Sequence, residues 1–492
     1  MKELVLSRVQ SFRFDDVFVT DMIQGKEYSY DEFFSRCLFI IQRLDSHCVP
    51  NKVVCIMDNS IELMACYFAI ILSGRVAVAI DPVKGREEIN GILSALEECY
   101  ILVDKTGKEK VEHYDEVVIR NGFNSFEKAD GSEIKTEVLN LLEKRDFQDD
   151  CLLTFTSGTS GNTKGVRNSL YNLCSTAETF NSNFEISNKN IFAHLMPMTY
   201  MAGILNTIIQ PFIAGAKIAI MGRFSPMLAF TFWQNVAKYE INTLWMSPSM
   251  LNIINKVGNE KVGSEYCMDR EMLFLIGTAP LQQKTRQVFE GKYGVTLYAS
   301  YGLSETLFLS TQTKDTVSRG DDNVGRILDG VKYKFSEQGE FLVDVPWMYL
   351  GYTNENTSDY FDGTYYKTGD LAEIEDGVLK IVGRAKDLII KGGMNISSAL
   401  IEKVVGQIDE VDECAVFGIV NNFQEECIVL AYSSGDTGHE LEKKINAVVL
   451  EKLGKNYAID LFYRIPSIPK NINGKTDKNS LKESFKQNDN QV

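Results

Sequence analysis

The chain has 492 residues, of which 44% are hydrophobic and 24% are charged, and its formal net charge is -16 at pH 7. This length exceeds what one compact core supports, so two or more domains are expected, and the composition excludes wholesale disorder. The acidic balance argues against a nucleic-acid partner, because nucleic-acid-binding proteins usually carry a basic face. An anionic substrate must therefore be held by a local site.

Ten cysteines are scattered singly, without a Cys-x-x-Cys pair or a histidine at metal-ligand spacing. This pattern predicts reduced core cysteines and no structural zinc site. Residues 1–8 meet a charge before a signal-peptide core could form. The longest apolar runs, such as 64–72, fall short of the roughly 20 residues that a membrane span needs. We expect a soluble, cytoplasmic protein without membrane insertion.

In the N-terminal part, short β-branched runs alternate with helical patterns. Strands expected at 52–57 and 76–80 flank a helix expected at 61–72, which is a β-α-β unit of a sheet covered on both faces. The alternation recurs further along the chain. It predicts strands at 217–221, 243–246 and 273–276, with helices at 226–239 and from 249. A large α/β region to about residue 340 is the expected result.

The texture changes from Gly339 onward. Short strands expected at 340–345, 363–367, 371–374 and 378–382 predict a small β-rich subdomain. The last hundred residues predict a helix at 398–405, strands at 413–419 and 427–431, a helix at 440–453, and a loop with Pro466, Pro469 and Gly474. The polar tail 486–492 is expected to be disordered. We place a hinge at 383–387, between an N-terminal domain (1–385) and a C-terminal domain (386–492).

The stretch 154–166, TFTSGTSGNTKGV, follows an apolar lead that ends a strand and precedes a helix expected near Asn168. Glycines allow close backbone approach, and successive N–H groups with Ser and Thr hydroxyls can converge on phosphate oxygens. The alternative is a flexible polar surface loop. The common NTPase loop does not fit, because it needs Gly-Lys-Ser/Thr and here Lys164 precedes Gly165. The candidate phosphate ligands are Thr156, Ser157, Gly158, Thr159, Ser160, Gly161 and Lys164.

Five further motifs follow in order: GTAPL at 277–281, YGLSET at 301–306, YKTGDL at 366–371, GRAKDLIIKGGMNI at 383–396 and PKNINGK at 469–475. Each has a plain structural reading on its own, as a β-turn, an exposed acid in a strand-to-helix turn, or a surface lysine. Taken together, the motifs resemble those of the superfamily of acyl-CoA synthetases, peptide-synthetase adenylation domains and luciferases. The resemblance covers almost the whole chain.

The resemblance implies an α/β fold with a large N-terminal AMP-binding region of several subdomains, one of them β-rich, and a small mobile α+β C-terminal domain. It also implies a role for each motif. The Tyr301 ring stacks on adenine, Ser304 contacts the α-phosphate, and Glu305 holds Mg²⁺, which prefers oxygen ligands. The other positions that the resemblance assigns to nucleotide or thiol binding are Gly277, Thr278, Ala279, Gly302, Asp370 and Arg384, with Lys386 at the hinge and Gly392 and Gly393 beside the pantetheine tunnel.

Lys475 falls on the lysine of the family's C-terminal catalytic loop, and we assign catalytic roles to Lys475, Thr156 and Glu305. An ammonium there can reach the acid carboxylate and the α-phosphate together and neutralise charge in the transition state. The sequence departs from the family's pattern afterwards, with Ser398 where proline is usual and Leu400 where glutamate is usual.

The acid pocket is expected to be mainly apolar, acyl- or aryl-binding, and walled by Tyr200, Met246, Thr278, Leu303 and Phe308. Thr278 adds bulk where the family has Gly or Ser. The family register places Tyr200 at the gate of this pocket, so the predicted role of His194 is structural. No aspartate stands near 198–201 to hold an α-amino group, which disfavours amino-acid activation.

The predicted activity is ATP-dependent adenylation of a carboxylic acid with release of pyrophosphate, and transfer of the acyl group to a thiol. The chain shows no carrier-domain serine motif, so the thiol is expected to come from coenzyme A or from a separate carrier protein's phosphopantetheine. An AMP-forming acid:CoA ligase is the leading hypothesis. The alternatives are a stand-alone enzyme that loads a carrier protein and a non-catalytic nucleotide-binding relative; the second is disfavoured because Glu305, Asp370, Arg384 and Lys475 are all present.

Overall fold

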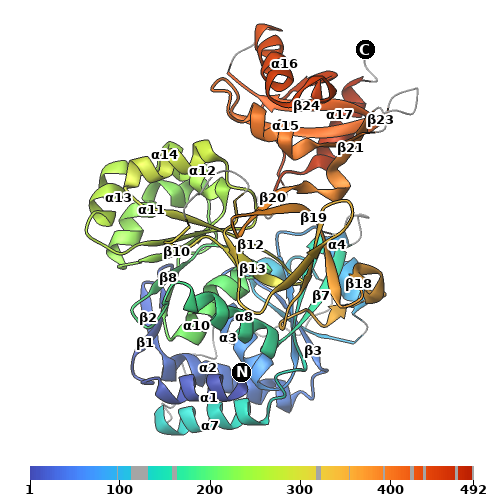
Figure 1. Cartoon of the computed structure of the whole chain (residues 1–492). Coiled ribbons are helices and arrows are strands. Elements are labelled where there is room, and N and C mark those ends of the chain that lie inside the picture. The colour runs from blue at the N-terminus through green and yellow to red at the C-terminus, as the bar shows by residue number, and fades with distance from the viewer. Residues whose placement is uncertain are drawn as a thin grey trace.

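The computed structural model describes residues 1–96, 98–111, 131–157, 163–316, 323–353, 355–391, 394–420, 426–435, 439–470 and 475–489. Figure 1 shows a large body and a smaller, orange-to-red body at the C-terminal end, joined through β19 (Tyr365–Glu375) and β20 (Val378–Arg384). Within the described ranges, no helix combines the length and apolar character needed to cross a membrane. All ten cysteines are free thiols, six of them buried.

A six-stranded sheet contains the first predicted β-α-β unit. β3 and β4 pair in parallel, and nearly every side chain of the intervening helix α3 (Ile61–Leu72) is buried, so that prediction is confirmed. The strand order is β17 (Gly351–Tyr352), β7 (Thr163–Ser169), β6 (Asp150–Ser157), β4 (Val76–Ile80), β3 (Lys52–Ile56) and β5 (Tyr100–Val103).

A nine-stranded sheet forms the second layer. Its central strands β8 to β12 are parallel, and helices α11 to α14 cover one face around the buried Trp233 and Phe289. The order is β14 (Arg326–Ile327), β13 (Leu307–Thr311), β12 (Leu297–Leu303), β11 (Leu273–Ile276), β10 (Thr243–Met246), β8 (Ile191–His194), β9 (Lys217–Ile220), β1 (Val17–Asp21) and β2 (Lys26–Ser29). The covering helices are α11 (Pro226–Lys238), α12 (Pro248–Val257), α13 (Glu260–Cys267) and α14 (Gln283–Tyr293).

One large apolar core lies between the two sheets and is filled mainly by helices that connect their strands. Helices α1 and α7 pack against each other at the end of the large body that lies away from the C-terminal region (Figure 1). The remaining helices of this body are α1 (Lys2–Ser11), α2 (Tyr30–Ser46), α4 (Arg86–Ala95), α5 (Lys105–Lys108), α7 (Gly131–Lys144), α8 (Leu170–Ser182), α9 (Met201–Ile204), the π-helix η2 (Leu205–Ile209) and α10 (Gln210–Ala214).

The predicted β-rich subdomain is present as a five-stranded sheet. Its order is β15 (Lys332–Phe335), β16 (Glu340–Asp344), β19 and β18 (Phe361–Asp362), with β20 paired to β19 and the short η3 (Thr357–Tyr360) before β18. The strands expected at 363–367 and 371–374 are one continuous strand, β19. Gly369 inside it has φ +72°, and the register shifts between Leu371 and Ala372. A glycine inside a strand often marks such an irregularity. The sequence pattern therefore predicted two strands that end on either side of Gly369.

The C-terminal region has its own apolar core on both faces of a three-stranded sheet. Helices α15 and α16 pack on one face, and α17 packs on the other. The elements are η4 (Ala385–Asp387), the hairpin β21 (Leu388–Lys391) and β22 (Met394–Ser397), α15 (Ser398–Val405), β23 (Glu413–Val420), β24 (Glu426–Ser433), α16 (His439–Leu453), η5 (Lys455–Tyr457), β25 (Leu461–Arg464) and α17 (Lys478–Asp489).

One expected boundary shifts by two residues, and one expectation about local structure is wrong. The helix expected near Asn168 begins only at Leu170, because residues up to Ser169 pair with β6 as strand β7 and the Ser169 hydroxyl then caps α8. The tail expected to be disordered from 486 is helical through Asp489, since α17 buries Leu481 and Phe485, which are one turn apart, against the C-terminal sheet. Residues 490–492 lie outside the described ranges.

Candidate active site

The carboxyl ends of the two large sheets meet, and side chains that follow three strands join them. Arg223, after β9, donates to both oxygens of Asp81, after β4, at 3.0 and 2.9 Å. Asn59, after β3, donates to Met196 O at 2.7 Å and accepts from Met198 N at 2.8 Å. Ligand sites of open α/β sheets lie outside the carboxyl ends of the strands. Three of the predicted motifs lie at this edge: the phosphate loop follows β6, GTAPL follows β11, and YGLSET begins near the end of β12.

The predicted phosphate loop is the turn of a hairpin rather than a strand-to-helix connection. β6 and β7 pair antiparallel, with Thr156 opposite Lys164 and Ser157 opposite Thr163 at the open end. The side chain of Ser157 and the whole of Gly158, Thr159, Ser160 and Gly161 lie outside the described residues. The described parts therefore place Thr156 and Lys164 at the two arms of the loop.

Lys164 is held between acidic and aromatic groups. Its Nζ forms an ion pair with Glu355 at 2.8 Å and hydrogen-bonds Tyr360 Oη. The same ammonium lies 4.4 Å from the Tyr360 ring centroid and 5.2 Å from that of Tyr352. A lysine whose side chain is only 12% exposed keeps its charge here because an opposite charge and two ring faces compensate for burial.

The second nucleotide motif forms the turn between two antiparallel strands. Tyr301 lies on β12, which extends through Leu303 instead of ending at Ser300. A Cβ at Gly302 would lie 2.0 Å from Leu307 O, so only glycine fits there. The Tyr301 hydroxyl donates to Asp370 Oδ2 at 2.6 Å.

Asp370 is a buried carboxylate that joins two predicted nucleotide-binding motifs. Its Oδ1 accepts from Arg384 Nε at 2.7 Å, and its other oxygen, Oδ2, accepts from Tyr301. Asp370 is 2% exposed, and it also sits across from Arg384 in the β19–β20 pair. Three residues predicted separately from three motifs are thus one hydrogen-bonded cluster.

Glu305 is the partly buried acid at the centre of the site. Burial raises the pKa of its carboxyl group, and the hydrogen bond from Tyr352 together with the nearby charges of Lys475 and Arg384 acts in the opposite direction. Tyr352 Oη donates to Glu305 Oε1 at 2.8 Å and lies 3.1 Å from Tyr366 Oη. The predicted catalytic lysine of the C-terminal region is therefore within electrostatic reach of the predicted metal-binding acid of the N-terminal region.

The predicted hinge residue Lys386 lies in the same charged neighbourhood. Burial and the charge of Arg384 lower the pKa of its ammonium group, and the charge of Lys475 adds to this effect. Gly392 and Gly393, expected beside the thiol tunnel, lie outside the described residues. Their neighbour Lys391 pairs with Asp460 at 2.7 Å. The charges of Arg384 and Lys475 thus both act on Lys386. The predicted tunnel residues are not among the described residues.

An aromatic wall stands beside the GTAPL turn. Trp245 stacks on Phe308, with centroids 5.4 Å apart and planes at 14°, and its Nε1 donates to Gln210 Oε1 at 2.7 Å. A Cβ at Gly277 would lie 3.4 Å from the Trp245 ring. Gln210 Nε2 is buried without a hydrogen-bond partner. Trp245 is therefore fixed in place next to two of the predicted motifs.

Thr278 occupies an unusual backbone conformation in the same turn. Its φ is +71°, which is a genuine outlier for a β-branched residue. Its Oγ1 is buried without a partner, whereas Ala279 beside it is half-buried. Strained residues of this kind collect at functional sites. Thr278, which replaces the Gly or Ser that is usual in the family, therefore also has a strained backbone.

One predicted pocket residue lies on the wrong face of the sheet. Met246 packs with Leu244 and Ile276 beneath the covering helices α11 to α14, while Trp245 packs with Phe308 in the core between the sheets. Successive side chains of a strand point to opposite faces, so Met246 faces away from the other predicted wall residues. The half-buried Tyr200 precedes α9, and Leu303 packs against the central core beside Phe308.

His194 is fully buried, as its predicted structural role requires. Its Nδ1 lies 2.7 Å from Thr207 Oγ1, and Thr207 also contacts Gly203 O at 2.7 Å. Burial lowers the pKa of His194 to about 4. The imidazole is therefore neutral and fastens β8 to the π-helix η2.

Sequence reasoning missed Tyr352, Trp245 and Gln210. Tyr352 belongs to none of the six motifs, and its contact with Glu305 spans 47 positions. Trp245 lies next to Met246, which the sequence predicted as the pocket residue on this strand. The one available signal was that large aromatic residues in buried strands are commonly wall residues of a site.

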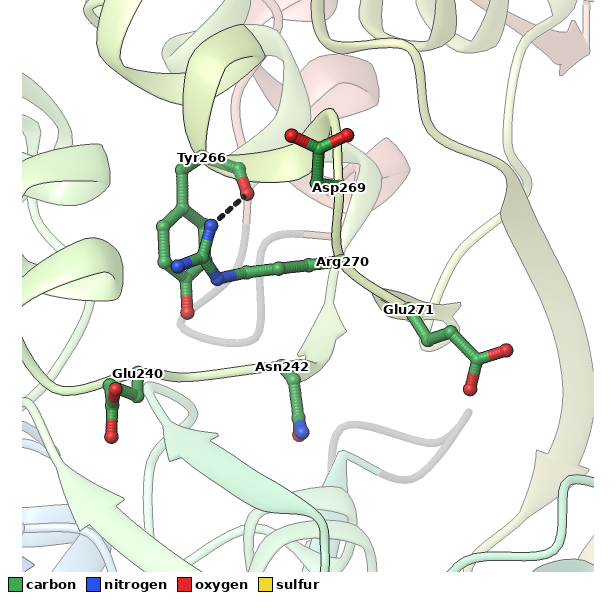
Figure 2. A pocket seen from close by; sticks show the side chains of 6 residues that line it. All are labelled: Glu240, Asn242, Tyr266, Asp269, Arg270 and Glu271. Atoms are coloured by element: carbon green, nitrogen blue, oxygen red, sulfur yellow. Dashed lines mark hydrogen bonds between the residues drawn. The ribbon is translucent and has the colours of Figure 1, made fainter.

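A hollow of about 340 Å³ lies elsewhere on the large body and is shown in Figure 2. Arg270 stacks over Tyr266 at 4.3 Å and donates to its carbonyl at 3.1 Å. The lining residues precede β10 and β11, so they lie at the amino ends of these strands, opposite to Gly277. Its lining side chains are Glu240, Asn242, Tyr266, Asp269, Arg270 and Glu271, and none of them belongs to a predicted motif.

Comparison with known proteins identifies the family. The family model for AMP-binding enzyme matches residues 7–353, and the model for AMP-binding enzyme C-terminal domain matches residues 400–475. The chain is similar to malonate–CoA ligase of Arabidopsis thaliana, with 27% identity over 70% of this chain and 62% of that protein. It is also similar to long-chain-fatty-acid–CoA ligase FadD13 of Mycobacterium tuberculosis, with 26% identity over 88% of each chain.

Solved structures agree with this at the level of the fold. ATP-bound MatB from Rhodopseudomonas palustris has a TM-score of 0.84 at 21% identity, covering 99% of both chains. The amide bond synthetase McbA from Marinactinospora thermotolerans has a TM-score of 0.82 at 18% identity, covering 98% of this chain and 99% of that one. The predicted mixed α/β fold with a small C-terminal domain is confirmed. The chain belongs to the AMP-binding enzyme family, as the resemblance of its motifs predicted.

Proposed function

We propose that this enzyme joins a carboxylic acid to coenzyme A through an acyl-adenylate. The observation that supports this most directly is the hydrogen-bonded cluster of Tyr301, Asp370 and Arg384. Glu305 lies within electrostatic reach of Arg384 and of Lys475. These groups match the needs of a nucleotide: a ring face, a ribose acceptor and cations for phosphate. ATP is the proposed nucleotide.

The first half-reaction replaces a poor leaving group by a good one. A carboxylate oxygen attacks the α-phosphorus of ATP, the bond from that phosphorus to the α,β-bridging oxygen breaks, and pyrophosphate leaves. Lys475 neutralises charge on the carboxylate and the α-phosphate as the transition state forms, while Thr156 and Lys164 flank the loop proposed to hold the phosphates. Asp370 and Arg384 hold the ribose, and Tyr301 supports the base.

Magnesium is the proposed counter-ion of the phosphates, and the residues present fit it. Among the described residues, no group of three or more His, Cys, Asp or Glu side chains could hold a metal alone. Glu305 offers a partly buried carboxylate with Oε1 already fixed by Tyr352. Mg²⁺ is commonly held by one or two carboxylates together with substrate phosphates. When bound, it neutralises charge on the departing pyrophosphate.

The second half-reaction uses the thiol. The sulfur attacks the acyl carbon, the bond from that carbon to the AMP oxygen breaks, and the thiol proton is released. We propose that the C-terminal domain (386–492) turns about the hinge at 383–387 between the two steps and so withdraws Lys475. The proposed thiol is coenzyme A, entering beside Gly392 and Gly393; the phosphopantetheine of a separate carrier protein is the alternative. A cytoplasmic location stays a prediction.

The proposed acid is a small molecule with a mainly apolar body. Trp245 and Phe308 form a continuous aromatic wall, with Leu303 and the Thr278 turn beside it. Met246 is removed from the predicted lining because it faces the other side of the sheet. Tyr200 keeps its proposed place at the gate.

A panel of acids tests this function. Malonate, oxalate, a long-chain fatty acid, 2-succinylbenzoate, butyrate and benzoate are each supplied with ATP and Mg²⁺, and pyrophosphate release is measured. We expect release with at least one acid, and AMP with thioester when coenzyme A is added. Lys475→Ala should lower pyrophosphate release about 10²- to 10³-fold, whereas Lys486→Ala, at an exposed position of α17, should not. ATP binding without turnover on the whole panel would favour the non-catalytic alternative.

A further inference from the structure

The residue three places after Lys475 is held at a junction of three elements. Lys478 is the first residue of α17, and its Nζ donates to Ser398 Oγ at 3.0 Å. The same ammonium forms an ion pair with Glu402 at 2.8 Å and lies 3.9 Å from Asp387 Oδ2. Ser398 and Glu402 belong to α15, and Asp387 ends the hinge turn η4. One side chain thus connects the Lys475 segment to the hinge and to α15.

The side chains that accept from Lys478 are held in place by other contacts of the C-terminal region. Glu402 Oε1 also accepts from Val416 N of β23 at 2.7 Å, and Cys414 Sγ donates to Glu402 O at 3.5 Å. Ser398 is 2% exposed, and the Lys478 side chain is 20% exposed. Exposed ion pairs stabilise little because two mobile side chains must be ordered. This contact differs from them, since its acceptors are already ordered by the C-terminal core.

The backbone that leads from Lys475 to Lys478 is also constrained. Asp477 N donates to Pro469 O at 2.9 Å, and an isolated β-bridge joins Lys470 to Thr476. The Asp477 carboxylate accepts from Ser480 N at 3.1 Å, which caps α17. The position of Lys475 is therefore set by where α17 begins.

We propose that Lys478 is a positioning residue for adenylate formation. By tying the start of α17 to η4 and α15, it sets the place of Lys475 relative to Glu305. The Ser398 hydroxyl is an acceptor that a proline at this position, usual in the resembling sequences, could not supply. The inference rests on the proposed function, because it assigns Lys478 a role through Lys475 in the first half-reaction.

A purely structural role makes a different prediction. If Lys478 only stabilised the C-terminal domain, its loss would weaken both half-reactions together. If it positions Lys475, its loss affects only the step in which Lys475 acts. A misplacement of about 1 Å can cost about 10²-fold in rate, so the first half-reaction is the sensitive readout.

The test uses the full chain with Lys478→Met, Lys478→Arg and, as matched control on the same helix, Lys486→Met. The first half-reaction is measured as pyrophosphate release with the best acid of the panel. The second is measured as thioester formation from that acid's chemically prepared adenylate and coenzyme A. For Lys478→Met we expect kcat of the first step to fall about 10- to 100-fold with little change in KM for ATP, and the second step to stay within about twofold of the unchanged chain. Lys478→Arg should restore part of the rate, and Lys486→Met should leave both steps unchanged.

Ser398→Ala provides a milder second variant if Lys478→Met does not fold. It removes one acceptor and leaves the Glu402 pair, so we expect a smaller fall confined to the first step. Equal losses in both steps, or no loss in either, would overturn the inference while the proposed function stands. A wild-type chain that releases no pyrophosphate with any acid, and a Lys475→Ala variant that behaves the same, would overturn the proposed function itself.

Discussion

A single hydroxyl orients Glu305, the partly buried acid at the centre of the site. Tyr352 Oη donates to Glu305 Oε1, and the ring of Tyr349 packs against Tyr352 with its own buried hydroxyl unpartnered. The two tyrosines are therefore a matched pair in one cluster. Tyr352 contacts the Glu305 carboxylate through its hydroxyl, whereas Tyr349 contacts Glu305 only through its backbone N–H, which donates to Glu305 O at 2.9 Å. A hydrogen bond to a charged group contributes about 1.5–3 kcal/mol.

Tyr352→Phe should therefore weaken the proposed magnesium site. We expect the Mg²⁺ concentration for half-maximal pyrophosphate release to rise about 10- to 100-fold, the equivalent of that hydrogen bond. Tyr349→Phe should leave it unchanged, because the Tyr349 hydroxyl makes no hydrogen bond to Glu305 and its backbone contact to Glu305 stays. The measurement is the rate of pyrophosphate release against Mg²⁺ concentration at fixed ATP. Equal responses of the two variants would contradict an orienting role for Tyr352.

His194 predicts how stability depends on pH. Its pKa is lowered by burial to about 4 in the folded chain, against about 6.5 for an unfolded histidine. The unfolded chain therefore binds more protons between these values, so stability is complete above pH 6.5 and falls as the pH drops toward 4. At pH 5.5 the loss for one such group is about 1.4 kcal/mol.

His194→Asn should remove this part of the pH dependence. Urea unfolding followed by tryptophan fluorescence at pH 8 and pH 5.5 gives the change in the free energy of unfolding for each chain. We expect that change to be about 1.4 kcal/mol smaller in the variant, even though the variant is less stable at both pH values. His47→Asn, at an exposed position after α2, is the control and should keep the wild-type difference. A variant with the full wild-type difference would exclude His194 as its source.

At the scale of elements, the turn between β11 and α14 combines strain with a predicted site. Thr278 at φ +71° carries a left-handed cost of about 1–2 kcal/mol, whereas glycine there would cost about 0.5–1 kcal/mol in chain entropy. Thr278→Gly should therefore raise the free energy of unfolding by up to about 1 kcal/mol. Thr278→Ala keeps the Cβ and should gain nothing. Urea unfolding of both variants checks this, and an equal gain in both would contradict strain at this turn.

Elements with a clear pattern were predictable from the sequence, and elements set by distant pairing were not. Helix α3 begins and ends where expected because an apolar run is bounded by Ser60 and Ser73, and Ser60 caps it. Residues 163–169 lead into the expected helix, but their strand β7 was not predicted, and it forms because β6 and β17 pair with it on both sides. Pairing with Gly351 and Tyr352, nearly two hundred positions away, leaves no local signal.

The same distinction applies to the site. Motif residues were readable because each motif is contiguous, and the structure brings Tyr301, Asp370 and Arg384 into one cluster. Met246 was wrong by one position, since a strand of four buried residues does not reveal which of two neighbours faces the site. Gln210 reaches Trp245 across 35 positions, and only the folded chain shows it.

At the scale of the whole molecule, the two bodies have separate apolar cores. The cores of the C-terminal region are built only from residues after Asp387. An ion pair between the two bodies, Lys284 with Asp409, is 3.5 Å long with side chains 46% and 93% exposed. Such pairs stabilise by at most about 1 kcal/mol. Weak coupling of this kind is what a rotation about the proposed hinge requires.

Weak coupling also predicts that the two bodies unfold separately. The three tryptophans, Trp233, Trp245 and Trp347, are all buried in the large body, so tryptophan fluorescence follows that body alone, while far-ultraviolet circular dichroism follows both. Coincidence of two probes is a test of two-state unfolding, and we expect the two urea curves to differ here. ATP at about 100 times its Kd should stabilise the large body by about 2.7 kcal/mol and move the fluorescence curve, leaving the other transition in place. Superimposable curves that move together with ATP would show one cooperative unit, and rigid coupling of that kind would leave no room for the proposed rotation.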